Sequence, residues 1–217
     1  MYIKKGNTRI VLVFSNFVVK IARIRLRQAI KSVLYSKILL PFKIIKEEGW
    51  IVYLDRKKHT KKRMLEFRKQ DKLHRIESEK RMEMKIPKCK RYEMYGSPEM
   101  ALMAGIMANL QESSFYRQTK NPFVMPTYFS FFGLFNIQKK GEEITFWKDE
   151  EIWFFVVKNI KNYHQIFIDA HVFADIRNFV LDDNGLLKLI DYGSRYAVEF
   201  LKINGKNLSE KFIKPPS

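Results

Sequence analysis

Two short apolar runs joined by a tight turn place the strongest limit on how this chain folds. The runs are residues 179–181 and 186–190, and residues 182–185 between them read Asp-Asp-Asn-Gly. Runs of this length joined through Asn-Gly predict a β-hairpin. The hairpin brings Asn178, just before its first strand, close to Asp191, just after its second. An amide oxygen and a carboxylate at one end of a hairpin suit Mg²⁺, which prefers oxygen ligands and usually keeps phosphate oxygens and water.

The segment from His171 to Gly193 resembles the catalytic and metal-binding loops of the protein-kinase-like superfamily. In that family a loop beginning with His leads to an Asn, and a short hairpin then leads to Asp-Phe-Gly. Here Asn178 takes the position of the metal-binding Asn, and the Asp-Tyr-Gly run that begins at Asp191 replaces Asp-Phe-Gly. The resemblance implies that Asn178 and Asp191 bind Mg²⁺, and that His171 is the structural histidine of the catalytic loop.

The catalytic base is the part of this motif that differs from the family. The family has its base two residues after the His, and this chain has Phe173 there, which cannot accept a proton. Asp175 is the nearest carboxylate in the loop and is therefore the expected base. An ordinary surface hairpin, in which Asp and Asn are common, is the alternative interpretation of the whole segment.

Three short strands are predicted at the start of the chain, over residues 2–4, 9–14 and 17–22, where β-branched runs are separated by Gly, Asn and Ser. Lys20 lies inside the third run. One interpretation is an edge-strand lysine that points to water. The run VVKIA also resembles the third-strand Val-Ala-Ile-Lys of kinases, whose Lys holds the α- and β-phosphates of ATP.

The turn before the second strand is the expected phosphate loop. The family has three glycines there, whereas this turn has only Gly6. Backbone N–H groups of Gly6, Asn7 and Thr8 are still able to cap a phosphate, as turn amides do.

A helix is predicted to begin at Pro98, after the N-cap residue Ser97. In a kinase-like fold this helix follows the third strand, and its Glu pairs with the strand Lys. We therefore assign Glu112 to Lys20. Glu99 is the competing acid, but it lies in the first turn, where the helix dipole accounts for a negative charge.

Two more extended runs, residues 123–132 and 134–138, are expected to complete the sheet. The second leads into the hinge, which in kinases borders the adenine pocket. A helix with acids in its first turn begins at Asp149, has an apolar face that runs to Phe167, and leads into the catalytic loop.

Residues 24–95 carry most of the excess positive charge of a chain whose net charge is +18. Residues 25–42 have helical spacing with an apolar stripe, residues 44–53 resemble a small hairpin, and residues 56–85 predict a long exposed helix. The ordinary interpretation is a solvated helix face. The functional interpretation is a basic surface for an anionic membrane or for nucleic acid, with the membrane favoured by the amphipathic stretch.

Length and composition suit one domain, or one domain with an insertion, because 217 residues with 46% hydrophobic content are enough for a core. The one cysteine, Cys89, cannot form an internal disulfide and fits a reducing compartment. The N-terminus has no signal-peptide hydrophobic region. No zinc-type Cys/His spacing, P-loop or G-x-S-x-G motif is present. We therefore expect a cytoplasmic protein, with peripheral attachment to a membrane as an extension.

Only 24 residues follow Gly193, too few for the Ala-Pro-Glu motif and the later helices of a protein kinase. The chain thus resembles small outlying kinases, such as the lipopolysaccharide-core sugar kinases and other bacterial or phage kinase-like proteins. The implied fold is α+β and two-lobed. It has an N-lobe with an antiparallel sheet and one packed helix (1–23 and 97–140), a basic, mostly helical insertion (24–96), and a reduced helical C-lobe (141–217).

The activity that the resemblance implies is ATP- and Mg²⁺-dependent phosphoryl transfer to a protein, a sugar or a lipid. The expected roles are phosphate binding by Lys20, orientation of that lysine by Glu112, metal binding by Asn178 and Asp191, and base catalysis by Asp175. Two other hypotheses stay open. A catalytically inactive kinase-like scaffold is suggested by Phe173 and the glycine-poor loop, and a nucleic-acid-binding protein is suggested by charge alone.

Overall fold

The computed structural model describes residues 1–6, 8–82, 98–160 and 170–212 of the chain. The chain divides into two compact units. The main unit consists of Met1–Arg23 and Gly105–Ser217, and the helical unit consists of Ile24–Ala104.

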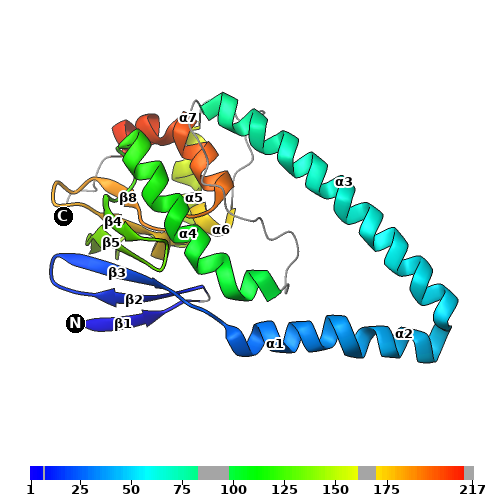
Figure 1. Cartoon of the computed structure of the whole chain (residues 1–217). Coiled ribbons are helices and arrows are strands. Elements are labelled where there is room, and N and C mark those ends of the chain that lie inside the picture. The colour runs from blue at the N-terminus through cyan, green and yellow to red at the C-terminus, as the bar shows by residue number, and fades with distance from the viewer. Residues whose placement is uncertain (7, 83–97, 161–169, 213–217) are drawn as a thin grey trace. The chain divides into compact units, whose positions relative to one another are not determined.

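The first sheet of the main unit has five antiparallel strands in the order β1-β2-β3-β5-β4 (Figure 1). All five were predicted, and their bounds are β1 (Tyr2–Lys5), β2 (Arg9–Val13), β3 (Phe17–Ala22), β4 (Thr127–Phe131) and β5 (Phe135–Lys139). Helix α4 (Pro98–Thr119) comes just before β4 in the chain, and it begins at the predicted proline.

β4 begins four residues later than the sequence predicted. Pro126 precedes it and has no N–H with which to continue a strand ladder. The residues before the proline pair elsewhere: the Met125 N–H donates to the Leu189 carbonyl at 2.9 Å, and the Leu189 N–H donates to the Phe123 carbonyl at 2.8 Å. This segment therefore links the first sheet to the hairpin near the predicted catalytic loop.

One face of the first sheet, here called the inner face, carries buried polar side chains. Lys20 pairs with Val11 on one side and with Asn136 on the other, and directly opposite residues of antiparallel strands share a face. The alternation of side chains along β2 places Arg9 on the face of Val11. The Asn136 side chain donates to the carbonyl of Asn109 in α4 at 2.8 Å, so α4 covers this inner face.

The second sheet contains the predicted hairpin. Its order is β6-β7-β8, with β6 (Glu142–Glu143), β7 (Phe179–Leu181) and β8 (Leu187–Leu189). The turn is fixed by Asp182, whose side chain accepts hydrogen bonds from the N–H groups of Asn184 and Leu186, both at 2.9 Å. Gly185 has a φ of 71°, a conformation that glycine adopts without strain.

The described residues of the main unit contain further helices after β5. They are α5 (Asp149–Lys158), α6 (Ala170–Phe173), the 3₁₀ turn η3 (Ile176–Asn178) and α7 (Arg195–Lys211). α5 begins at Asp149 as predicted and ends at Lys158, and the predicted continuation to Phe167 lies largely outside the described residues. α7 starts after the N-cap Ser194, whose hydroxyl accepts from the Ala197 N–H at 3.0 Å.

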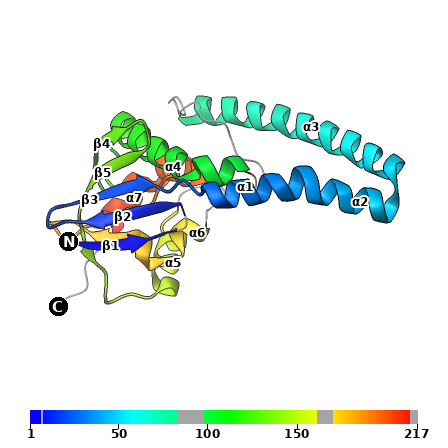
Figure 2. The ribbon, with the colours of Figure 1, turned by 60° about the horizontal axis from the view of Figure 1, so that its bottom comes forward.

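Consecutive helices make up residues 26–82 of the helical unit, except for Gly49 (Figure 2). They are α1 (Leu26–Leu34), the π-helix η1 (Tyr35–Leu39), α2 (Leu40–Glu48) and α3 (Trp50–Met82). Pro41 does not end the helical run, because it lies in the first turn of α2, where a missing N–H is tolerated. None of the helices that the structure describes is long and apolar enough to cross a membrane.

The predicted hairpin over residues 44–53 is wrong, because this segment is helical. Ile44 and Ile45 belong to α2, and α3 begins at Trp50. The chain changes direction at Gly49, which has a φ of 91°. Glycine marks both turns and helix C-termini, so the sequence pattern alone did not separate the two structures.

Candidate functional site

The strand lysine and the helix glutamate that were paired from the sequence lie in contact. Lys20 Nζ on β3 is 3.1 Å from Glu112 Oε2 on α4, and the two side chains are 4% and 0% exposed. Lys20 Nζ also donates to the carbonyl of Ile190. The lysine therefore joins the sheet, α4 and the segment that leads to Asp191.

Arg9 completes this site, although the sequence analysis assigned it no role. Its Nη1 donates to Glu112 Oε1 at 2.6 Å, its Nη2 donates to Asp191 Oδ1, and its side chain is 7% exposed. Arg9, Lys20, Glu112 and Asp191, here called the four-charge cluster, come from β2, β3, α4 and the segment after β8. Their formal charges sum to zero, which makes the burial of charged groups tolerable.

Burial and neighbouring charges shift the pKa values of Lys20, Arg9 and Asp191. Burial lowers the pKa of Lys20, and Glu112 only partly offsets this effect. Burial also opposes the charge on Arg9, but Asp191 and Glu112 outweigh it and raise the pKa of Arg9. Partial burial would raise the pKa of Asp191, but Arg9 and then Lys20 hold that pKa below its usual range. Arg9 and Asp191 are therefore both charged at neutral pH.

Asp191 is the cluster member that solvent reaches, since its side chain is 47% exposed. The next two residues fix its position. Tyr192 is fully buried, and its hydroxyl lies 2.8 Å from Thr127 Oγ1 and donates to the Met125 carbonyl at 3.0 Å. Gly193 packs so closely on α4 that a Cβ there would lie 2.7 Å from Ala108 Cβ. The Asp-Tyr-Gly run thus presents one carboxylate from a rigid support.

The predicted metal ligands Asn178 and Asp191 lie at the same end of the hairpin. The Ile190 N–H donates to the Asn178 carbonyl at 2.8 Å. The side-chain amide of Asn178 donates to the carbonyls of Val172 and His171, at 3.0 and 3.3 Å, which fixes its orientation.

The donor set at this end of the hairpin fits Mg²⁺ in part. In the described parts of the chain, no three or more His, Cys, Asp or Glu side chains form a group that could hold a metal ion. The Asp191 carboxylate and the Asn178 amide oxygen are both hard donors, so a Mg²⁺ ion here would take its other ligands from phosphate and water.

The predicted base, Asp175, is bound by its neighbour Arg177. Asp175 Oδ1 accepts from the Arg177 Nε at 2.8 Å and from the Arg177 N–H at 3.0 Å, and Oδ2 accepts from Nη2 at 2.7 Å. Arg177 therefore lowers the pKa of Asp175. Asp175 is the N-cap of η3, so it has a structural role besides any chemical one. His171 is exposed, and its backbone carbonyl supports Asn178.

Phe173, at the position where the kinase resemblance predicts a base, is part of the core. Its side chain is fully buried, and its ring lies 4.4 Å from that of Phe200 in α7, measured between centroids. The position therefore contributes to the core.

The predicted phosphate loop is described in part, because Asn7 lies outside the described residues. The Gly6 N–H donates to the Arg9 carbonyl at 2.9 Å, and the Thr8 carbonyl accepts from the Arg23 N–H at 2.8 Å. The Gly6 amide is thus used within the turn, and phosphate binding by this loop stays a prediction.

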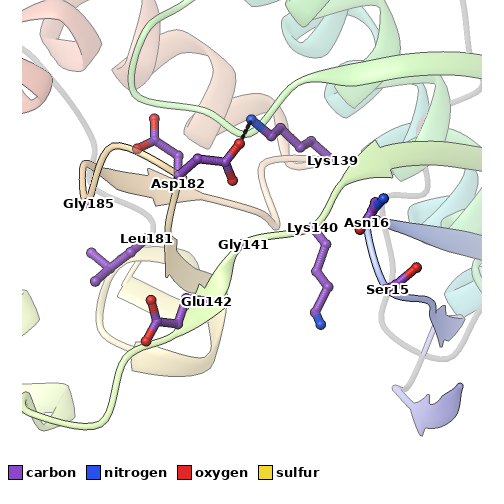
Figure 3. A pocket seen from close by; sticks show the side chains of 10 residues that line it. Ser15, Asn16, Lys139, Lys140, Gly141, Glu142, Leu181, Asp182 and Gly185 are labelled. Carbon is purple, nitrogen blue, oxygen red and sulfur yellow. Dashed lines mark hydrogen bonds and ion pairs between the residues drawn. The ribbon is translucent and has the colours of Figure 1, made fainter.

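A pocket of about 440 Å³ lies apart from the cluster (Figure 3). The turn between β2 and β3, residues 139–142 and the β7–β8 turn line it. Lys139 forms an ion pair with Asp183, at 2.7 Å. Figure 3 shows the side chain of Lys140 extending away from that of Lys139. No member of the four-charge cluster lines this pocket.

Comparisons with known proteins found no relative of this chain. No family model matches the chain, and neither the curated proteins nor the solved structures include a significant match.

Replacing Glu112 by Gln should lower the free energy of unfolding by about 3–5 kcal/mol, because it leaves the buried cations Arg9 and Lys20 with one partner fewer. The matched control is Glu143→Gln, which removes the partner of Lys4 from a pair whose side chains are 63% and 56% exposed. This control should change stability by less than about 1 kcal/mol. Urea unfolding measures both values, and equal losses would contradict a buried network.

The lowered pKa of Asp191 predicts an acid-sensitive contribution to stability. This contribution is present above the unfolded pKa of about 4 and is lost as the pH falls through the lower folded pKa. Urea unfolding at a series of pH values should show the wild type more stable than Asp191→Asn near neutral pH. The two free energies should converge below about pH 4, because a protonated Asp191 resembles Asn. A difference that does not change with pH would refute the charged pair with Arg9.

Proposed function

We propose that the main unit binds ATP with Mg²⁺ at the four-charge cluster and acts as a kinase-like phosphotransferase. The observation that carries this proposal is the meeting of Lys20, Glu112 and Asp191, which lie far apart in the sequence. A strand lysine, a helix glutamate and an aspartate after a hairpin are the groups that position phosphates and metal in kinase-like sites.

The surroundings of the cluster support the same proposal. In the described residues of the main unit, α4 is the helix between β3 and β4 of the antiparallel sheet, and the β7–β8 hairpin follows. This order agrees with a reduced two-lobed kinase-like fold. Gly193 packs closely on α4, the helix that carries Glu112. This contact gives Asp191, two residues before Gly193, a defined position near that helix.

Each charged residue would have a distinct role. Lys20 would donate to the α- and β-phosphates, while Glu112 would hold the lysine in place. Asn178 and Asp191 would hold Mg²⁺, which when bound neutralises charge on the phosphates. Arg9 neutralises Asp191 in the absence of a ligand, and it would remain beside Glu112 when a bound Mg²⁺ neutralises Asp191 instead.

A kinase-like scaffold without catalytic activity is the second candidate, because of the structure around the catalytic loop. Phe173 is part of the core, and Arg177 holds Asp175, the nearest carboxylate. Such a protein would bind nucleotide at the same cluster, so nucleotide binding and turnover have to be measured separately.

Nucleotide binding should be visible as thermal stabilisation of the wild type by ATP with Mg²⁺. A ligand at a hundred times its Kd that binds only the folded chain adds about 2.7 kcal/mol. Lys20→Met and Asp191→Asn should lose this stabilisation. Lys206→Met, which changes a side chain that is 84% exposed in α7, should keep it. A shift of unchanged size in both cluster variants would rule out this site.

Turnover separates the enzyme from the scaffold. Asp175→Asn keeps an N-cap residue for η3 but removes the base, so phosphoryl transfer should fall about 10²–10⁴-fold while nucleotide binding persists. Initial rates with protein, sugar and lipid acceptors measure this effect. Full turnover by Asp175→Asn would refute only the choice of base. If the wild type binds ATP but transfers no phosphate to these acceptors, the scaffold is the better conclusion.

A further inference from the structure

Large apolar side chains are exposed along the helical unit from Ile24 to Leu54. The most exposed are Phe42 in α2, at 74%, and Ile51 in α3, at 83%. Exposed apolar groups gathered in one segment mark a surface that contacts a partner or a membrane.

α1 has its apolar and basic residues on separate sides. Leu26, Ile30 and Leu34 are each four residues apart and share one face of the helix, and they are 59%, 51% and 47% exposed. Arg27 and Lys31 follow one position later at the same spacing, so a row of cations borders the apolar face. This is the pattern of a helix that lies in the headgroup region of a membrane.

The start of α3 adds an exposed basic stretch. Residues 56–63 contain six Lys or Arg and no Asp or Glu, and all eight side chains are exposed. Of these cations, Arg56 pairs with Glu48 of α2 at 2.5 Å. The stretch therefore presents positive charge next to the exposed apolar segment.

We propose that the helical unit docks on an anionic membrane surface. The apolar side chains of residues 24–54 would enter the headgroup region, and the neighbouring lysines and arginines would contact the lipid phosphates and carboxylates. Charge complementarity favours a membrane over a second copy of this chain, whose own cations would be repelled. Contact with phosphate backbones of a nucleic acid would use the charge but leave the aliphatic side chains exposed. The proposal does not depend on nucleotide binding by the main unit.

Vesicle flotation with the whole chain tests this proposal. Vesicles of phosphatidylcholine and phosphatidylserine in equal parts should carry the protein at low salt, whereas vesicles of phosphatidylcholine alone should carry much less. Binding to the anionic vesicles should weaken as salt is raised, because the electrostatic part is screened.

Two double variants separate the apolar from the electrostatic contribution. Phe42→Ser with Ile51→Ser should reduce partitioning by about tenfold or more, because both side chains lose apolar area that enters the membrane. Its control is Phe132→Ser with Phe154→Ser, which removes side chains of the main unit that are 77% and 69% exposed.

Lys58→Glu with Lys62→Glu should also reduce binding, and Lys202→Glu with Lys206→Glu in α7 is the control of equal charge change. Both controls should bind within about twofold of the wild type.

Three results would overturn the proposal. The first is no binding of the wild type to the anionic vesicles at low salt. The second is binding to an RNA that falls in Lys58→Glu with Lys62→Glu but not in Phe42→Ser with Ile51→Ser, without vesicle binding. The third is self-association in sedimentation that the apolar variant abolishes, again without vesicle binding.

Discussion

The main unit depends on a set of ion pairs that water hardly reaches. Removing Arg9, Lys20 and Glu112 from water costs several kcal/mol for each charge, so none of them is stable there without the others. Glu112 is the centre of the set, because its two carboxylate oxygens accept from two different strands. The requirement to pair these charges fixes β2, β3 and α4 against the segment that carries Asp191, and it leaves that carboxylate facing solvent.

Much of the sheet and of the site could be predicted from local patterns. The hairpin of β7 and β8 follows from two apolar runs and a turn, and the strand positions follow from β-branched runs. The contact of Lys20 with Glu112 was expected from the kinase resemblance. Arg9 was missed because an arginine at the start of a strand looks like a turn residue. The short turn after β2 could have indicated its position. This turn pairs Val11 with Lys20, and the pairing places Arg9 on the same face of the sheet as Lys20.

What could not be predicted depends on contacts between distant segments. The sequence ranks Asp175 as a base, but only the folded loop brings the Arg177 side chain onto its carboxylate. In the sequence, Phe173 stands where the kinase resemblance predicts a catalytic group. Only the fold shows that its ring packs against that of Phe200 in α7. Residues 44–53 were misassigned because Gly49 fits a hairpin turn and a helix end equally well, and the choice depends on how α2 and α3 continue.

The central claim is that the four-charge cluster is a site for nucleotide phosphates and metal, and a crystal structure of the chain with a non-hydrolysable ATP analogue and Mg²⁺ tests it most directly. We expect a phosphate oxygen within hydrogen-bond distance of Lys20 Nζ and the metal on Asp191 and Asn178. A nucleotide bound elsewhere, for example in the pocket beside Lys139, with the ion pairs of Arg9 and Lys20 unchanged, would contradict the claim.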